Sequence, residues 1–509
     1  MSSEQTTCSA YHQLMAFIRN AGVLKSTAGL LAWDQQAIMP PGGLVHRSQQ
    51  LAQLARMIHE MMIDPRVGDL LSACEADGDW ADDPCAAASV NIREIRWKYE
   101  RATRLPAELV ESLSETSALA HGRWVEARKA NDFEHFCPWF EKIVQLQKRK
   151  AECLGSGDGE PWDVLADEYE PGCRAADIDR LFASLRKQLI PLVNELMASA
   201  HHPGNVLCQL VRPGAKFKQF VRKLAADVGF DFDRGRLDES PHPFCSGIHC
   251  HDVRMTTRFD EPNPVEPLFS TLHETGHGIY GQNLPESHFG TPMGEAVSYA
   301  IHESQSRMWE NMVGRSRSFW VWCLPRLCQG LGIGGDKLDV DGAYGSANIV
   351  TPGLIRVEAD EVTYNLHIMV RFEIERALMK DEIQVRDVPC IWAEKYKEYL
   401  GVDVPDDRHG CLQDIHWSSD AIGYFPSYTL GNLYAAQFFD AAQEALPGLV
   451  QLFENGEFSP LREWLNKHIH CHGMRYRSDE LCQRVTGRPL SAEPLLGHLV
   501  DKLRPIYGL

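Results

Sequence analysis

The pentapeptide His273-Glu274-Thr275-Gly276-His277 holds the residues of this chain best suited to chemistry. Residues four apart lie on one face of an α-helix, so the two histidines can bind a single metal ion together. Glu274 lies one position further round, where its carboxylate can take a proton from a water molecule at the metal. This His-Glu-x-x-His pattern is typical of zinc peptidases and predicts metal-assisted hydrolysis, most often of a peptide bond.

The residues around the pentapeptide favour a helix. Leu268, Leu272 and Ile279 recur at helical spacing, and Gly281 is a suitable end. Gly276 costs a helix interior about 1 kcal/mol relative to alanine, so a purely structural helix would more often have alanine there. The alternative, a helix with two solvated or buried histidines, is therefore disfavoured.

Composition and charge exclude several classes of partner. The chain has 509 residues, of which 44% are hydrophobic and 24% charged, as in ordinary globular proteins. Its net charge of −19 argues against nucleic acid or an anionic membrane as the main partner. No apolar run approaches the length of a bilayer span, and residues 1–8 lack the features of a signal peptide. The 15 scattered cysteines fit free thiols in a reducing compartment, so we expect a cytoplasmic protein.

Most of the chain has the pattern of α-helix, and the one convincing strand region is 247–259, just before the pentapeptide. We predict a mainly α fold, a single large helical body with a small β-sheet beside the metal-binding helix. Residues 1–509 are expected to form one catalytic domain, helical over about 1–235 and with the metal site in about 236–509. The predicted helices are 48–62, 87–103, 106–131, 133–154, 176–200, 216–228, 294–313, 355–379, 389–400, 430–445, 459–469 and 478–486.

A hydrolytic zinc site needs a third protein ligand and one open position. The downstream candidates are Glu286, His288, Glu295, His302, Glu303 and Glu310. No histidine follows His277 at the short spacing of an all-histidine site, so a carboxylate on the next helix is the better solution. The residues alone leave Glu295 and Glu303 as alternatives, about two turns apart on the predicted helix 294–313.

Several further motifs resemble, in order, the signatures of the carboxypeptidase Taq family of metallocarboxypeptidases. They are His242-Pro243-Phe244, Asp252-Val253-Arg254-Met255-Thr256, the segment that begins His302-Glu303-Ser304, Ile355-Arg356-Val357-Glu358-Ala359-Asp360 and Gly410-Cys411-Leu412-Gln413-Asp414-Ile415-His416-Trp417. Residues 31–43 and 507–509 are also similar to this family, so the resemblance covers nearly the whole chain. Thr275 departs from the family, which more often has a bulky apolar or aromatic residue there.

The resemblance implies a complete metal site. Glu303 would join His273 and His277 as the third ligand of one Zn²⁺ ion per chain, and Co²⁺ is another metal that the family can use. Glu274 would be the general base and later the proton donor to the leaving amine.

Arg356 is the implied ligand of the peptide's free α-carboxylate, because a guanidinium group can bind a carboxylate through two hydrogen bonds. The structural alternative is an ordinary helical arginine paired with the nearby acids Asp360 and Glu361.

Four further residues are expected to contact or shape the substrate site. Tyr424 and His416 are implied as polar partners of the substrate or the tetrahedral intermediate, and His242 and Arg254 would shape the pocket and the edge strand. A buried ring, a core histidine or another structural role is the alternative for each. The histidines and cysteine at 468–472 are interpreted as structural, because alternate residues on a helix end do not share a face.

The resemblance implies a metal-dependent carboxypeptidase of broad specificity that releases single C-terminal residues from peptides. It also implies a homodimer and a deep groove closed by helices. Two alternatives are a zinc endopeptidase or oligopeptidase of similar helical architecture and a non-catalytic, metal-stabilised peptide-binding protein. Glu274 opposes the last, because a structural metal site has no use for a general base.

Overall fold

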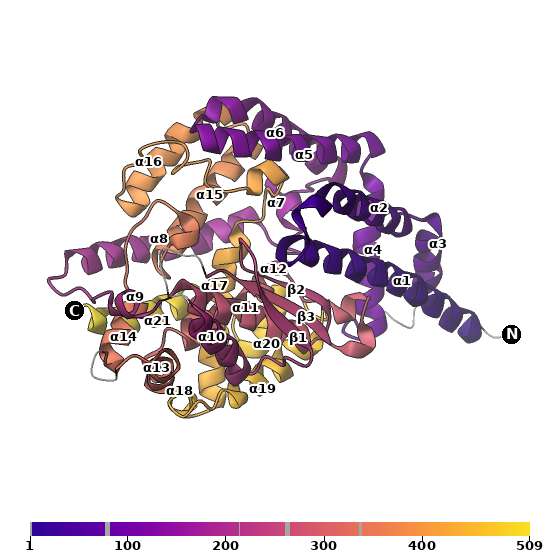
Figure 1. Ribbon diagram of the computed structural model, residues 1–509. Helices are drawn as coiled ribbons and strands as arrows, with labels where there is room; N and C mark the ends of the chain where they lie inside the picture. Colours follow the sequence, from indigo (N-terminus) through magenta and orange to yellow (C-terminus); the bar gives the residue numbers. More distant parts are fainter. Residues whose placement is uncertain (1–2, 77–81, 213, 260–264, 335–337) are drawn as a thin grey trace. The chain divides into compact units, whose positions relative to one another are not determined.

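The computed structural model describes residues 3–76, 82–212, 214–259, 265–334 and 338–509. Helices account for most of these residues, and three strands form one small sheet, so the predicted mainly α fold is confirmed (Figure 1). The α-helices are α1 (Ser3–Ala37), α2 (Leu44–Met62), α3 (Pro65–Ala76), α4 (Ala87–Arg104), α5 (Ala107–Ala130), α6 (Phe133–Leu154), α7 (Pro161–Ala166), α8 (Ala175–Ala198), α9 (Val206–Leu210), α10 (Ala215–Val228), α11 (Glu266–Gln282), α12 (Tyr299–Arg307), α13 (Arg317–Leu331), α14 (Val340–Ala347), α15 (Thr363–Met379), α16 (Val388–Leu400), α17 (Pro426–Ala445), α18 (Leu449–Phe453), α19 (Ser459–His468), α20 (Ser478–Thr486) and α21 (Glu493–Ile506).

Shorter helical segments connect several of these helices. A π-helical segment, η4 (Met308–Val313), continues α12 directly. The 3-10 turns are η1 (Pro41–Gly43), η2 (Glu286–His288), η3 (Pro292–Gly294), η5 (Arg356–Glu358), η6 (Val385–Asp387), η7 (His416–Ser419) and η8 (His470–His472). None of the described helices combines the length and the apolar character needed to cross a lipid bilayer.

The chain forms two compact units, and each is assembled from three separate stretches. Unit 1 comprises Met1–Thr103, Asn205–Tyr344 and Phe438–Pro489. Unit 2 comprises Arg104–Gly204, Gly345–Gln437 and Leu490–Leu509. No boundary falls near residue 235, and the expected single catalytic domain stays a prediction.

The sheet of unit 1 supports one side of α11, the helix that contains His273 and His277. Its strands β1 (Gly235–Glu239), β2 (Phe244–His249) and β3 (Asp252–Thr257) lie in the order β1-β3-β2, with β1 parallel and β2 antiparallel to β3 (Figure 1). The predicted strand region 247–259 is therefore the end of β2, a turn and β3, while β1 was not predicted.

Glycines allow α11 to pack closely on this sheet. A Cβ atom on Gly278 would lie 2.6 Å from the ring of Phe230 and 3.0 Å from Sδ of Met255. At Gly281 the nearest atoms belong to Val253, at 3.4 Å. Val253 and Met255 are fully buried and alternate along β3, so one face of the strand packs on α11.

Two predicted helices begin later than expected. The helix predicted from residue 294 is wrong over its first turn, because α12 begins only after Ser298, whose side chain caps it. The helix predicted from 355 is wrong over two turns. Arg356 lies in the separate 3-10 turn η5, and α15 begins at Thr363, where Asp360 accepts the amide hydrogen bond at 3.0 Å. In both cases a capping side chain sets the start of the helix.

Candidate active site

Three side chains of unit 1 converge on one point. His273 and His277 on α11 direct Nε2 toward the carboxylate of Glu303 on α12, at 3.6 and 3.4 Å from its Oε2. Ligand atoms of these residues all lie within 4.8 Å of one another, and no other group of three potential ligands occurs among the described residues. Two imidazoles and one carboxylate fit a divalent ion such as Zn²⁺ and leave a coordination position for a reactant.

An arginine one turn later holds the second oxygen of Glu303. Arg307 donates from Nε to Oε1 of Glu303 at 2.7 Å, which leaves Oε2 directed at the two histidines. Burial alone would raise the pKa of Glu303, but Arg307 and His273 hold it well below its usual range. The carboxylate is therefore ionised and oriented for a metal ion.

The other ring nitrogens of both histidines also have partners. Nδ1 of His273 donates to Oε2 of Glu310 at 2.9 Å, and Nδ1 of His277 lies 2.5 Å from Nδ1 of His302. Glu310 lies in the π-helical segment η4 and is also bound by Arg307 at 3.1 Å. Such contacts fix the ring orientation of a metal-binding histidine and direct Nε2 to the ion. A π-helical turn beside these groups is common at functional sites.

Glu274 has the properties of a general base. Its side chain is only 5% exposed, and its Oε2 atom has no hydrogen-bond partner among the described residues. Burial raises the pKa of Glu274, while His273 and His277 act in the opposite direction. An orphaned buried carboxylate oxygen is costly and therefore rare, and a water molecule activated at the site would satisfy it.

Gly276 permits the close approach of α11 and α12. A Cβ atom there would lie 2.4 Å from the carbonyl oxygen of Gln305 and 2.6 Å from Cα of Ser306, both backbone atoms that neighbour Glu303. The glycine that weakens the isolated helix therefore brings the third carboxylate within reach of the histidines.

Gly276→Ala is expected to separate the two helices and to lower stability by about 1–3 kcal/mol through overpacking. Because Glu303 moves with α12, affinity for the metal falls as well. Thermal unfolding with and without added Zn²⁺ measures both effects. Gly122→Ala in α5 is the matched control, because its Cβ atom meets no atom within 4 Å. Equal stability and metal response in the two variants would contradict the packing role.

Glu295, which the sequence left as the alternative third ligand, has a different role. Glu295 lies in the loop before α12, where Nζ of Lys98 donates to Oε2 at 2.5 Å. Lys98 lowers the pKa of Glu295 to about 2, against the effect of burial. This side chain belongs to an ion pair with α4 and not to the group formed with Glu303. Glu286 and His288, in η2, are likewise outside that group.

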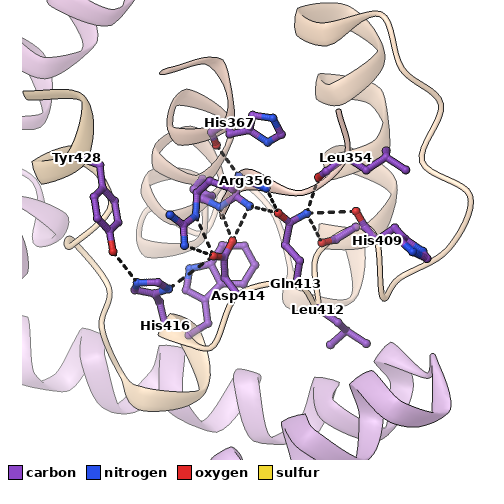
Figure 2. Close-up of polar contacts among 12 residues, drawn as sticks. Leu354, Arg356, His367, His409, Leu412, Gln413, Asp414, His416 and Tyr428 are labelled. Carbon is purple, nitrogen blue, oxygen red and sulfur yellow. Dashed lines mark hydrogen bonds and ion pairs between the residues drawn. The ribbon is translucent and has the colours of Figure 1, made fainter. Parts of the chain in front are cut away.

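A second polar cluster lies in unit 2 around Asp414 (Figure 2). Arg356 donates to Oδ1 of Asp414 from Nε at 2.9 Å and from Nη2 at 2.7 Å, and its Nη1 donates to the hydroxyl of Tyr364 at 3.0 Å. Arg371 binds the other oxygen of Asp414 at 2.6 Å. Oε1 of Gln413 accepts from the backbone of Arg356 and the guanidinium of Arg371.

The charged side chains of this cluster, two arginines and one aspartate, carry one net positive charge. Arg356, Arg371 and Asp414 are 5%, 0% and 7% exposed, and the two arginines share one carboxylate. Burial would raise the pKa of Asp414, but the arginines hold it far below its usual range. A buried net positive charge suits an anionic group, such as a peptide's terminal carboxylate. The alternative pairing of Arg356 with its sequence neighbours does not occur: Asp360 caps α15 and Glu361 binds Lys502.

His416 and Tyr424 lie together in unit 2. Their rings stack with centroids 5.4 Å apart, and Nε2 of His416 lies 3.4 Å from the hydroxyl of Tyr428 (Figure 2). Burial lowers the pKa of His416 to about 3, so the ring is neutral at physiological pH. The guanidinium of Arg356 lies 5.0 Å from the ring centre of Tyr428, which links these rings to the charged cluster.

Two expected substrate residues, Arg254 and His242, belong to the sheet and its connecting loop. Arg254 forms two hydrogen bonds with Asp252, at 2.8 and 2.9 Å, and lies 4.3 Å from the ring centre of Trp33 on α1. It projects from the face of β3 opposite to the one that packs on α11. His242 is exposed in the loop between β1 and β2. These positions favour a structural role for Arg254.

The sequence interpretation overlooked Arg307 and treated Glu310 only as a possible ligand. Both follow Glu303 on the same helical stretch, Arg307 four residues later, so their spacing could have indicated contact. His470, from the histidine-rich segment, is buried and binds Oε1 of Gln305 through Nε2 at 2.9 Å. This contact agrees with the structural interpretation of that segment.

Comparisons with known proteins identify the family. The family model for the carboxypeptidase Taq (M32) metallopeptidases matches residues 13–503. This chain belongs to that family. It is 44% identical to thermostable carboxypeptidase 1 of Thermus thermophilus, over 98% of this chain and 99% of that protein. It is 36% identical to carboxypeptidase 1 of Bacillus subtilis, over 94% and 95%.

Solved structures give the same result. The M32 carboxypeptidase from Deinococcus radiodurans superposes with a TM-score of 0.94 and 37% identity, and the match covers 98% of this chain and all of that one. As a member of the M32 family, the protein is a metal-dependent carboxypeptidase that acts on peptides. The endopeptidase and the non-catalytic alternatives are therefore set aside.

Proposed function

We propose that this carboxypeptidase binds one Zn²⁺ ion per chain through His273, His277 and Glu303, and that Co²⁺ can replace it. The observation that supports this site is the convergence of the three ligand atoms within 4.8 Å, next to the unpartnered oxygen of Glu274. Imidazole and carboxylate ligands in this number suit Zn²⁺.

Glu274 is the general base in this proposal. A bound divalent ion polarises the scissile carbonyl group and lowers the pKa of water. Glu274 accepts the proton of the attacking water and then donates it to the nitrogen of the leaving amino acid. Burial raises the pKa of Glu274, which makes its carboxylate a stronger base.

Arg356 recognises the free C-terminus of the peptide in this proposal. Asp414 holds its guanidinium group in a fixed orientation, while Arg371 neutralises Asp414 and leaves the charge of Arg356 available. Tyr424 and His416 form hydrogen bonds with the substrate, and His242 and Arg254 shape the pocket and the edge strand. Recognition through the terminal carboxylate and not a side chain is consistent with broad specificity.

The proposed activity is tested by incubating the Zn²⁺-loaded protein with a peptide library and following the products by mass spectrometry. A ladder of single-residue losses from the C-terminus is expected. Parallel samples that are stripped with a chelator and then reloaded with Zn²⁺, Co²⁺ or Mg²⁺ identify the metal. Internal cleavage, or equal activity with all three ions, would contradict the proposal.

We further propose a cytoplasmic homodimer. The 14 cysteines from Cys74 to Cys482 are free thiols, which suits a reducing compartment. Apolar side chains are exposed on the pair α1–α2, with Val45 74% and Val23 53% exposed, and α2 has no buried residue. Covering this surface in a second copy would remove apolar area from water. Light scattering measures the molar mass in solution. A monomer at micromolar protein concentration would contradict the proposed dimer.

A further inference from the structure

Glu375, on α15 of unit 2, is a fully buried acid with no part in the reaction described above. Three N–H groups donate to its carboxylate. Oε2 accepts from Nε1 of Trp162 at 3.2 Å and from the backbone nitrogen of Gly423 at 2.9 Å. Oε1 accepts from Nε1 of Trp417 at 2.9 Å. None of the ion pairs between described residues involves Glu375.

This environment is unusual for a buried acid. Burial raises the pKa of Glu375 to about 7, while the three donors and the charge of Arg371, one turn earlier on the helix, act in the opposite direction. An apolar residue would fill the space at lower cost, because a buried acid that forms no ion pair is expensive to remove from water. The acid therefore indicates a need for an acceptor of several hydrogen bonds at this point.

Two of the three donors flank the proposed substrate-binding residues. Trp417 directly follows His416, and Gly423 directly precedes Tyr424. A single carboxylate thus holds both ends of the stretch 416–424, here called the substrate loop. The third donor, Trp162, belongs to α7 and joins the same carboxylate to the helical body of unit 2.

The backbone of the substrate loop has little freedom to find another anchor. Gly423 has a φ of +95°, and a Cβ atom there would lie 2.7 Å from the backbone nitrogen of Ala166 at the end of α7. The middle of the loop contains Asp420 with a φ of +54°, and its carbonyl oxygen accepts from Gln147 at 2.7 Å. A non-glycine residue such as Asp420 keeps a left-handed conformation only when surrounding contacts determine it.

We propose that Glu375 is a positioning residue of this carboxypeptidase, which fixes the substrate loop so that His416 and Tyr424 meet the peptide in a defined geometry. The inference rests on the proposed substrate roles of these two residues. A carboxylate can satisfy all three donors at once. A glutamine amide has one acceptor oxygen and one NH₂ group, so at least one donor would face an N–H group.

Glu375→Gln tests this role. KM for a short peptide is expected to rise about tenfold, with kcat within about twofold, because the loss of one or more buried hydrogen bonds loosens the loop but leaves the metal site unchanged. Hydrogen exchange of the segment 416–424, followed by mass spectrometry, is expected to accelerate about tenfold. The amide of Gly423 reports directly on its bond to Glu375.

Glu373→Gln is the matched control, because Glu373 is on the same helix and binds Arg186, Lys395 and Tyr399 instead of the loop. It is expected to leave KM and the exchange of the segment 416–424 unchanged. If Glu375→Gln does not fold, Trp417→Phe removes one loop donor and takes its place in both measurements. Unchanged KM, or faster exchange without a rise in KM, would overturn the positioning role.

His416→Ala and Tyr424→Phe separate this inference from the proposed function. A raised KM in these two variants with an unchanged KM in Glu375→Gln would refute the inference alone. Unchanged kinetics in the two variants would instead refute their substrate roles, whatever the exchange data for Glu375→Gln show.

Discussion

Glu274→Gln is expected to lower kcat by about 10²–10⁴-fold, the usual contribution of a general acid–base group. The amide cannot accept a proton, whereas its size matches the carboxylate. His273, His277 and Glu303 are unchanged, so the variant should still bind one Zn²⁺ ion per chain. Steady-state kinetics and metal analysis on the same sample measure both properties.

A conservative variant serves as the control for Glu274. Glu274→Asp keeps the carboxylate but withdraws it by one methylene group, so an intermediate loss is expected. Full activity of Glu274→Gln with one bound ion would show that another group is the base. Loss of the metal in Glu274→Gln would indicate a structural role instead.

Arg356→Gln is expected to lower kcat/KM about 10²–10⁴-fold, because two charge-assisted hydrogen bonds to the terminal carboxylate are lost. Blocking the peptide as a C-terminal amide should have a similar effect on the unmodified enzyme. For Arg356→Gln, however, the acid and the amide should be cleaved at similar rates. The kinetics of the four combinations of enzyme and substrate give the interaction free energy between Arg356 and the terminal carboxylate.

Arg376→Gln is the matched control for Arg356. Arg376 also belongs to unit 2 but forms ion pairs with Glu160 and Asp179 at a partly exposed site. The preference for a free carboxylate should be retained in this variant. If Arg356→Gln still prefers a free carboxylate, another cation must recognise that group. Arg371 is then the next candidate.

Local spacing in the sequence was sufficient to predict the helix α11, but not to choose between the two candidate carboxylates. Helical spacing correctly predicts that His273 and His277 share a face, since that relation is local. Glu295 and Glu303 could not be separated, because a helix was predicted through both. Only the cap at Ser298 excludes Glu295 from α12, and the ion pair with Lys98 depends on a helix almost 200 residues away.

Contacts between distant segments account for the other differences. The partner of Arg356 is Asp414, which lies 58 residues away, and no local spacing could reveal it. Asp360 is an exception, because aspartate is a favoured N-cap residue and could have indicated the start of α15 from the sequence alone. The sequence showed only that Gly276 lowers the stability of its own helix. Its benefit comes from close packing against α12, a contact between segments that the sequence does not show.

The division of both units into three stretches makes each unit depend on residues that lie far apart in the sequence. Unit 1 includes Phe438–Pro489, and His470 in this stretch binds Gln305 on α12, two residues after Glu303. Loss of this stretch would therefore remove a support of α12, although it leaves His273, His277 and Glu303 in place.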